Sequence, residues 1–484
     1  MPSAPQSRGS SNSGRIEARC GLDMTFCAEH ASSGSLAGPA FNAASMPVQS
    51  APGSVVSVRI LFLGTDFVWP ADGGGRVRTL SQLSVLSSLP DVERIRLFTG
   101  GEKAIGEEDR AALLRQLPKL DLADPVFHPV HLFKHPRYVP HVAWLRLAHG
   151  VPYIAGKWDS ASFRTALERE LSRDAYDVVW LNGLGIAHYL SLVRRLQPKA
   201  RVILDQHNVE SDRFAQFARR QRGAKKLLAD AEWRATRRFE RGVLRAVDAV
   251  AAISDDDARA YHELAGVEAL TVPQVVSFVR REAPSTNEQH FIWIGNLSWA
   301  PNARGLSWFC GEVWPRVRER LPDARLEIAG TGLSTDAGGA ARAPLAWRAP
   351  GITTLGFVAD LSPLYERSIA MVAPILGGAG VRMKLLEAFR HGVPVVTTPD
   401  GAAGLPITPG HEAFVEADAA AFGARTIELA TSSEARARLR EAGYSFLEEH
   451  NQHPAAQRVV WALLGGGARR QAARADVPST IAAS

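Results

Sequence analysis

A glycine-rich stretch followed by charged side chains is the part of the chain best suited to bind a phosphate group. Gly377, Gly378, Gly380 and Arg382 lie between a predicted buried strand at 369–373 and a predicted helix at 383–391, and Lys384 and Glu387 follow within that helix. Glycines let the backbone approach a ligand closely, and the free N–H groups at a helix start favour an anion. Two fixed cations beside that start suit a diphosphate. The other interpretation is a tight turn with a solvated Lys/Glu pair.

The helix after this loop places a carboxylate beside the cations. Glu387 lies three positions after Lys384, so both side chains share one helical face, where Glu387 can accept a hydrogen bond from a ribose hydroxyl. Gly392 and Pro394 end the helix, and 395–398 predicts another strand. Strand, loop, helix and strand in this order are typical of an open α/β sheet, whose ligands bind outside the carboxyl ends of the strands.

The same order occurs near the start of the chain. Residues 58–64 predict a buried strand, and 72–76 opens the next helix with three successive glycines. Such glycines are costly inside any regular element, and loops of this kind hold ligands on rigid scaffolds. We therefore expect the loop at 72–76 to bind a ligand rather than to form a passive turn.

A polar run follows the predicted strand at 201–205. Polar groups at the carboxyl edge of a parallel sheet usually serve ligands, which makes His207 a candidate hydrogen-bond donor to a ligand or to a developing charge. Asp205 and Glu210 are candidates for orienting His207 or for contacting hydroxyl groups of the ligand. The alternative is a hydrogen-bonded structural histidine.

The chain restarts this pattern in its second half, where Gly295 and Asn296 follow a predicted strand at 290–294 and Asn302 precedes a helix predicted at 303–321. A chain of 484 residues is too long for one ordinary core, so two domains are expected. The predicted segments are a disordered extension at 1–57, a first domain at 58–280, a second domain at 286–446, a crossover helix at 447–464 and a disordered tail at 465–484.

Composition excludes several classes of protein. Hydrophobic content of 46% and charged content of 22% are those of a globular protein, and no apolar run reaches the ~18 residues of a membrane span. Three cysteines provide neither a disulfide framework nor a metal-ligand spacing, which favours a cytoplasmic location. We assign ordinary surface and packing roles to His128, His131, His135 and His141 and an N-cap to 255–257, and we predict no metal site.

A basic tract at 213–245 contains eleven Lys/Arg against three Asp/Glu and predicts a long helix. Basic amphipathic helices bind anionic membrane lipids, so peripheral contact with the inner face of the membrane is one interpretation. A solvated charged face is the other. Nucleic acid is disfavoured as a partner, because the tract lacks interleaved aromatics and no known nucleic-acid module is present.

The loop and helix at 377–388 resemble the donor-site segment of glycosyltransferase family 4, the retaining nucleotide-sugar transferases of the GT-B fold. They are similar above all to a bacterial exopolysaccharide-type subgroup, whose pattern is a glycine-rich loop, Arg or Gln, any residue, Lys, two apolar residues and Glu-Ala. The resemblance extends over about 58–464 and is clearest in 290–405.

The resemblance implies an α/β protein of two facing, doubly wound Rossmann-like domains with a cleft between them. It implies transfer of a sugar, with retention, from a nucleotide-diphosphate donor to a glycan or lipid-linked acceptor, without a further cofactor. The implied catalytic residues are His207, Lys384 and Glu387. The implied donor-binding residues are Gly74, Gly75, Arg76, Gly295, Asn296, Gly378, Gly380, Arg382, Lys384 and Glu387.

Two positions depart from the family pattern. Ala379 stands where most members have the first of two glutamates, and 273–275 reads Pro-Gln-Val in place of Pro-Asn-Gly. The first change removes a group expected to contact the donor sugar. Two alternatives therefore stay open, a GT-B nucleotide-sugar epimerase and a non-catalytic nucleotide-sugar-binding partner.

Overall fold

The structure is a computed structural model, which describes residues 57–69, 74–101, 106–124, 126–127, 138–281, 288–333, 344, 347–358, 360–378 and 381–465. Almost all of the extension and the tail predicted at 1–57 and 465–484 lies outside these residues. The same is true of Gly380, Ala379, His128, His131 and His135.

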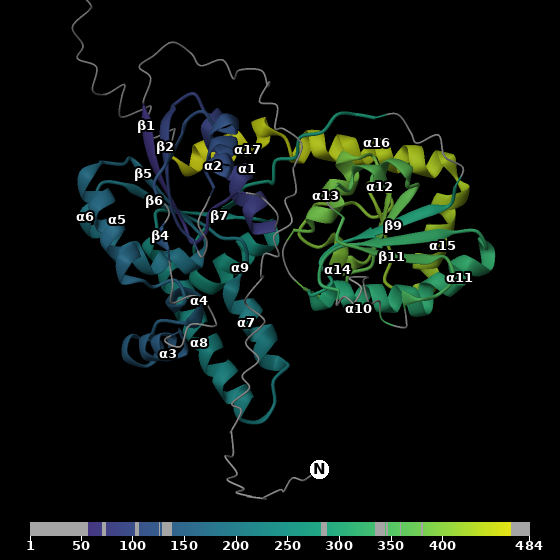
Figure 1. Cartoon of the computed structure of the whole chain (residues 1–484), viewed down its shortest axis with the longest axis horizontal. Helices are drawn as coiled ribbons and strands as arrows, with labels where there is room; N and C mark the ends of the chain where they lie inside the picture. The colour runs from purple at the N-terminus through teal and green to yellow at the C-terminus, as the bar shows by residue number, and fades with distance from the viewer. Residues whose placement is uncertain are drawn as a thin grey trace, which may run out of the picture.

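The described strands form two sheets in which every strand pair is parallel (Figure 1). The first sheet has the order β3-β2-β1-β5-β6-β7-β8, with β4 paired to β2. Its strands are β1 (Val58–Gly64), β2 (Val92–Gly101), β3 (Leu120–Leu122), β4 (Val126–Phe127), β5 (Val178–Asn182), β6 (Arg201–Asp205), β7 (Ala249–Ala252) and β8 (Ala269–Thr271).

The second sheet has the order β11-β10-β9-β12-β13-β14. Its strands are β9 (His290–Ile294), β10 (Arg325–Ala329), β11 (Ile352–Gly356), β12 (Ala370–Ala373), β13 (Val395–Thr397) and β14 (Phe414–Val415). The central strands of both sheets are apolar at nearly every position, which is what strands covered on both faces require.

Helices cover both faces of each sheet. Those of the first half are α1 (Gly74–Ser88), α2 (Glu107–Gln116), α3 (Tyr138–His149), α4 (Tyr153–Gly156), α5 (Ala161–Arg173), α6 (Leu190–Leu196), α7 (Glu210–Arg219), α8 (Gly223–Ala246) and α9 (Asp255–Ala265). Those that follow β9 are α10 (Ala300–Trp308), α11 (Trp314–Arg320), α12 (Ser362–Arg367), α13 (Met383–Arg390), α14 (Pro399–Ala402), α15 (Ala419–Thr431), α16 (Ser433–His450) and α17 (His453–Leu463).

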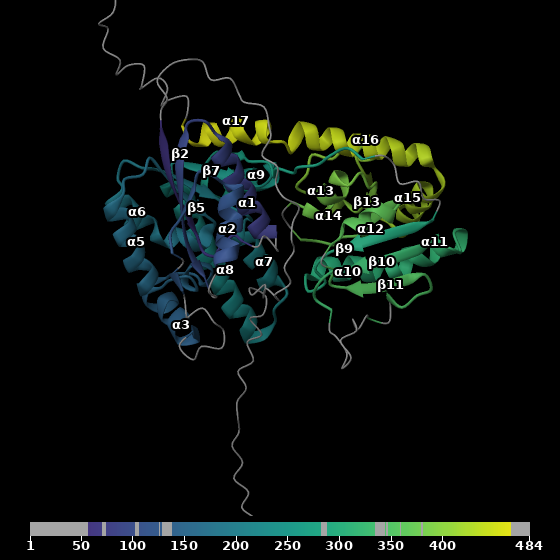
Figure 2. The same ribbon diagram turned by 45° about the horizontal axis from the view of Figure 1, so that its top comes forward.

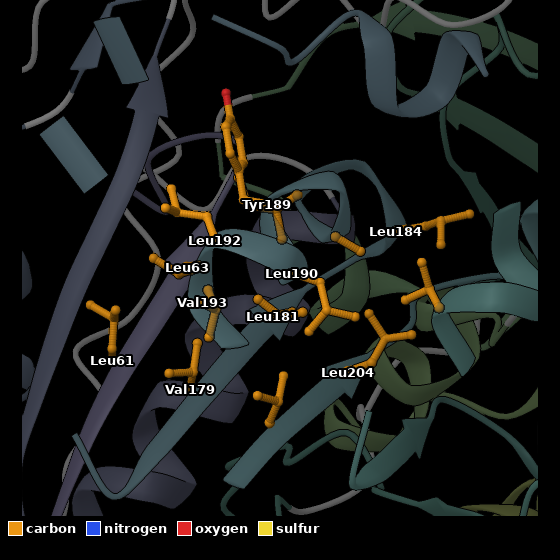
Figure 3. Close-up of a cluster of buried hydrophobic side chains, with 14 of the residues drawn as sticks. Leu61, Leu63, Val179, Leu181, Leu184, Tyr189, Leu190, Leu192, Val193 and Leu204 are labelled. Atoms are coloured by element: carbon orange, nitrogen blue, oxygen red, sulfur yellow. The ribbon is translucent and has the colours of Figure 1, made fainter. Parts of the chain in front are cut away.

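Alternating side chains divide each core into two layers. On β1, Leu61 and Leu63 join one apolar cluster, which continues into the helices of that face, whereas Ile60 and Phe62 join the cluster on the other face. Figure 3 shows part of the first cluster, including Leu61, Leu63 and Tyr189. The second sheet is built in the same way, so each sheet is a rigid platform for the loops at its carboxyl edge.

Two predicted helices are interrupted. The basic tract forms two helices, α7 and α8, because the chain turns at 220–222 and Gly223 adopts a positive φ of 57°. The helix predicted at 303–321 contains a π turn at Phe309–Val313 before α11. Pro315 lies in the first turn of α11 and has no N–H to donate to the preceding turn, so the regular helical ladder cannot continue there.

The last helix returns from the second half to the first (Figure 2). α16 covers the second sheet, and α17 packs on α1, where Ala456, Val460 and Leu463 complete the core beneath β1. The chain segments between the halves are also joined directly, since Asn451 Nδ2 donates to the Gln274 carbonyl at 2.7 Å.

Candidate functional site

The order of the second sheet places a crevice at one point of its carboxyl edge. From β9 the chain moves to β10 on one side, and it later returns to β12 on the other side. α10 follows β9 over one face, and α13 follows β12 over the opposite face. The two connecting loops therefore diverge between β9 and β12, and ligands of open α/β sheets bind at such a switch point.

Lys384 lies where these two loops meet. It belongs to the first turn of α13, yet its Nζ donates to Asn302 Oδ1 on α10 at 2.8 Å and lies 4.5 Å from the centre of the Trp293 ring. Burial lowers the pKa of Lys384 to about 7, and the neighbouring Arg382 charge acts in the same direction. A lysine with a pKa near 7 is only partly protonated at neutral pH, and a bound anion favours its protonated, charged form.

The loop after β9 is shaped around that ammonium group. A β-carbon at Gly295 would lie 2.8 Å from Lys384 Nζ and 3.0 Å from Asn302 Nδ2, so glycine alone leaves room for both. Asn302 in turn donates to the Asn296 carbonyl at 2.8 Å. The structure thus brings together Gly295, Asn296, Asn302 and Lys384, which lie on separate segments of the sequence.

The glycine loop before α13 packs tightly against the start of α10. Gly377 and Gly378 have φ values of 82° and 96°, and a β-carbon on Gly378 would lie 2.5 Å from the Trp299 ring. The Gly377 N–H donates to Asp400 Oδ2 at 2.7 Å. These two glycines therefore shape the loop and its packing, while the backbone at Gly380 lies outside the described residues.

Arg382 is more enclosed than its sequence position suggested. Only 5% of the residue is exposed, and its Nε and Nη2 donate to the Asp400 carbonyl at 3.2 and 3.1 Å. Burial lowers its pKa, and Asp400 acts in the opposite direction. Arg382 thus ties the glycine loop to α14 and places its positive charge beside Lys384.

Glu387 lies one turn further along α13 and remains partly exposed. Its carboxylate faces Arg390 at 3.4 Å, and burial raises its pKa despite that cation. Lys384 and Glu387 share one helical face, as the spacing predicted.

The first sheet has a switch point of the same kind between β1 and β5. Asn182 at the end of β5 lies 2.9 Å from His207 Nε2, and its amide nitrogen donates to Thr79 Oγ1 on α1. A β-carbon at Gly75 would lie 3.9 Å from His207 Nδ1. Two predicted site residues, Gly75 and His207, are thus neighbours.

The ring of His207 has a defined protonation pattern. Burial lowers its pKa, with Asp205 acting in the opposite direction, so the neutral ring is favoured. Because the Asn182 amide oxygen is an acceptor, Nε2 carries the proton and Nδ1 is left as an acceptor. The donor role anticipated for His207 from the sequence would therefore fall to Nδ1, and it requires the protonated ring.

The Asp205 side chain is buried in the interior and pairs within the protein, so it does not face a ligand. Its side chain is fully buried and pairs at 3.2 Å with Arg78 on α1. Its second oxygen lies 3.9 Å from His207 Nε2.

Arg76 forms a 2.8 Å ion pair with Asp66, and Gly74 opens α1.

Sequence reasoning missed Glu240, which holds the loop that carries His207. Its buried carboxylate accepts hydrogen bonds from the Glu210 and Ser211 amides at 2.9 Å and from the Gln206 side chain at 3.1 Å. Burial raises its pKa to about 7. Glu240 lies thirty-three positions after His207, and its only sequence signal is that it is one of three acids in the predominantly basic tract.

The described residues contain no group of three or more His, Cys, Asp or Glu side chains arranged to hold a metal ion. Among those same residues, no helix is long and apolar enough to cross a membrane.

Comparison with known proteins assigns the second half of the chain. Residues 288–432 match the family model described as glycosyl transferases group 1. This segment is therefore similar to glycosyltransferases of group 1. The segment contains the Gly295 loop, the glycine loop at 374–382 and all of α13, so it contains the whole Lys384 site.

A protein from the cps region of Klebsiella pneumoniae, called an uncharacterized 44.6 kDa protein, is 27% identical over 161 residues. The alignment covers 33% of this chain and 42% of that protein, so the chain spans less than half the length of this curated relative.

Solved structures match over most of the chain. Anabaena HepE, solved in complex with UDP and glucose, has a TM-score of 0.55 at 13% identity and covers 84% of this chain and 100% of its own. Sucrose-phosphate synthase from Thermosynechococcus elongatus has a TM-score of 0.57 at 15% identity, with 86% and 100% covered. At such identities the likeness shows the fold, which is GT-B, with two Rossmann-like domains as predicted.

Proposed function

We propose that the protein is a retaining glycosyltransferase that moves a sugar from a nucleotide-diphosphate donor to a glycan or lipid-linked acceptor. The observation that carries the proposal is the partly buried Lys384 ammonium group, held between the loops after β9 and β12 at the start of α13. The match of 288–432 to a glycosyltransferase family supports the same assignment.

In the proposed complex, the donor diphosphate lies at the start of α13. Lys384 and the helix N-terminus stabilise the charge that develops on the leaving diphosphate, and Arg382 adds a fixed positive field behind them. Glu387 accepts hydrogen bonds from the ribose hydroxyls. Such preorganised groups act without reorganisation during the reaction.

The acceptor belongs, in this proposal, to the edge of the first sheet. His207 Nδ1 accepts a hydrogen bond from a sugar hydroxyl near Gly75, while Gly74 and Arg76 complete the loop. The acceptor hydroxyl attacks the anomeric carbon on the face that the diphosphate leaves, which retains the configuration. The bond to the diphosphate oxygen breaks as the new glycosidic bond forms, and the proton of the acceptor hydroxyl passes to the leaving diphosphate oxygen.

The setting we propose is assembly of a cell-surface or extracellular polysaccharide. Its support is the Klebsiella pneumoniae relative from a cps region. The donor and acceptor are then both intermediates of glycan synthesis, and a cytoplasmic location follows from the use of a nucleotide sugar.

The test has two steps. A thermal-shift screen against UDP, GDP, ADP and their sugars identifies the donor, because a ligand of the native state raises the apparent stability. The selected nucleotide sugar is then incubated with and without acceptor glycans, and products are analysed by mass spectrometry and NMR. Acceptor-dependent transfer with a retained anomeric configuration is expected. Interconversion of the donor without acceptor, or binding without any turnover, would contradict the proposal.

A further inference from the structure

The basic tract forms a helical hairpin that projects from the first half of the molecule. α7 and α8 pack against each other, and their connection at 220–222 forms the tip (Figure 1). Residues 213–229 contain six Lys/Arg and no Asp/Glu. Five of these cations are exposed around the tip, and they are Arg219, Arg220, Arg222, Lys225 and Lys226.

A second helix extends this surface, although it lies about eighty residues earlier in the sequence. Arg146 on α3 donates to the Ala231 carbonyl at 3.2 Å and pairs with Glu232 at 3.3 Å, so α3 lies beside the first part of α8. Residues 138–149 also contain no Asp/Glu.

Large apolar side chains are exposed on both helices at this junction. Their exposed fractions are 56% for Trp144, 86% for Leu147, 72% for Leu227 and 59% for Leu228. Leu227 and Leu228 lie one helical turn from Ala231 toward the tip, and Trp144 and Leu147 flank Arg146. These four make up half of the eight large apolar residues that are exposed among the described residues. Such clustering differs from the single, scattered apolar residues of an ordinary protein surface.

We propose that this surface, the tip of the α7–α8 hairpin with the adjoining part of α3, docks on an anionic lipid bilayer. Anionic headgroups attract each Lys or Arg near the membrane by about 1 kcal/mol. Leu and Trp side chains insert at the boundary between headgroups and acyl chains, where their apolar area leaves water. Nucleic acid would match the cations but would leave these apolar side chains in water.

Because α7 begins next to the His207 loop, docking of the hairpin would also place that loop relative to the bilayer. α7 begins at Glu210, three residues after His207, and its ten residues span about 15 Å toward the tip. The His207 loop would then face the bilayer at a distance that a membrane-bound substrate can bridge. This last point rests on the proposed function, whereas the docking itself does not.

Sedimentation with vesicles tests the docking. The full chain is mixed with phosphatidylcholine vesicles containing either no anionic lipid or about 30 mol% phosphatidylglycerol, an anionic fraction chosen to give a negative surface potential. We expect sedimentation with the anionic vesicles only, and its loss near 0.5 M salt, where the screening length falls to a few ångströms (about 4 Å). Equal binding to both vesicles, or no binding to either, would overturn the proposal.

Paired variants test the surface itself. Arg220→Glu with Arg222→Glu should weaken vesicle binding at least about tenfold, because two favourable charges become repulsive. The matched control is Arg316→Glu with Arg320→Glu on α11, which changes the net charge equally and should retain binding to a greater extent. Equal losses in the two pairs would contradict a defined docking surface.

The apolar contribution is tested in the same way. Leu147→Glu with Leu227→Glu should abolish sedimentation, whereas Val279→Glu, at another exposed apolar position, should leave it close to the wild type. Circular dichroism and binding of the nucleotide sugar verify that each variant is folded and keep this test separate from that of the transferase. Vesicle binding unchanged in the double leucine variant, or a preference for RNA over anionic vesicles, would overturn the proposal.

Discussion

Among single residues, Lys384 is the one on which the proposed binding of the donor depends most. Replacing it with methionine keeps the length and apolar character of the side chain but removes the charge that we assign to the diphosphate. A hydrogen bond to a charged group contributes about 1.5–3 kcal/mol, so affinity for the nucleotide sugar should fall about 10- to 100-fold in Lys384→Met. Isothermal titration calorimetry measures the change. Arg320→Met, on the surface of α11, is the control and should bind as the wild type does.

The pH dependence of donor binding reports on the same group. The pKa of Lys384 is about 7 in the free protein, and a bound diphosphate should raise it. Above pH 7 the free lysine is neutral, so binding must take up a proton and affinity should fall as pH rises, by up to about tenfold per pH unit. A nucleotide sugar keeps its charge over this range. Titrations from pH 6 to 9 should show the decline in the wild type and a flat profile in Lys384→Met; a decline in both would assign it to another group.

Residue spacing identified the candidates but not their partners. The pairing of Lys384 with Glu387 follows from helical periodicity, which the sequence displays directly. The contact of Lys384 with Asn302, and of His207 with Asn182, joins side chains that are distant in sequence. Local pattern contains no information on such contacts, and Glu240 was missed for the same reason.

At the scale of elements, the close packing of α10 on the glycine loop should be sensitive to one methyl group. A β-carbon at Gly305 would lie 1.8 Å from the Pro374 carbonyl oxygen, so Gly305→Ala must displace either α10 or the loop. We expect a lower melting temperature and weaker nucleotide binding, with a cost of roughly 1–3 kcal/mol for such overpacking. Gly311→Ala, in the same helical tract with open space around it, should leave both unchanged.

The loop that carries His207 should depend on Glu240. Glu240→Ala leaves three buried donors without their acceptor, and each unsatisfied group costs about 1–3 kcal/mol. We expect a lower melting temperature and a reduced kcat, with nucleotide binding in the second half retained. Equal loss of binding and turnover would contradict a role confined to the first half.

Helices and strands were predictable where the spacing of apolar residues and the local composition indicate the same kind of element. The buried strands were visible as apolar runs, because strands of a parallel sheet are covered on both faces. Most helices were visible from apolar residues at helical spacing. The breaks within 213–245 and 303–321 were not predicted, since a positive φ at Gly223 and a π turn before Pro315 depend on how the chain packs.

At the scale of the whole molecule, the return of α17 to the first half should contribute to its stability. Leu463 is almost fully buried beside α1 and β1, so Leu463→Ala should cost about 2–5 kcal/mol. Thermal unfolding of the wild type, Leu463→Ala and the half-buried control Val459→Ala measures this. A melting temperature that falls no further in Leu463→Ala than in the control would refute the assignment.

The two-sheet architecture was predictable because the strand, loop and helix pattern occurs twice, and the strand order confirms it. The arrangement of α3 beside α8 was not predictable, since it depends on contacts between segments with no shared pattern.

The central claim is that a donor diphosphate binds at the start of α13, between the loops after β9 and β12. A crystal structure of the protein with the nucleotide sugar selected by thermal shift tests this most directly. The account predicts the diphosphate within hydrogen-bonding distance of Lys384 Nζ and the ribose beside Glu387. A nucleotide sugar bound elsewhere, with Lys384 still donating to Asn302 and the start of α13 vacant, would contradict it.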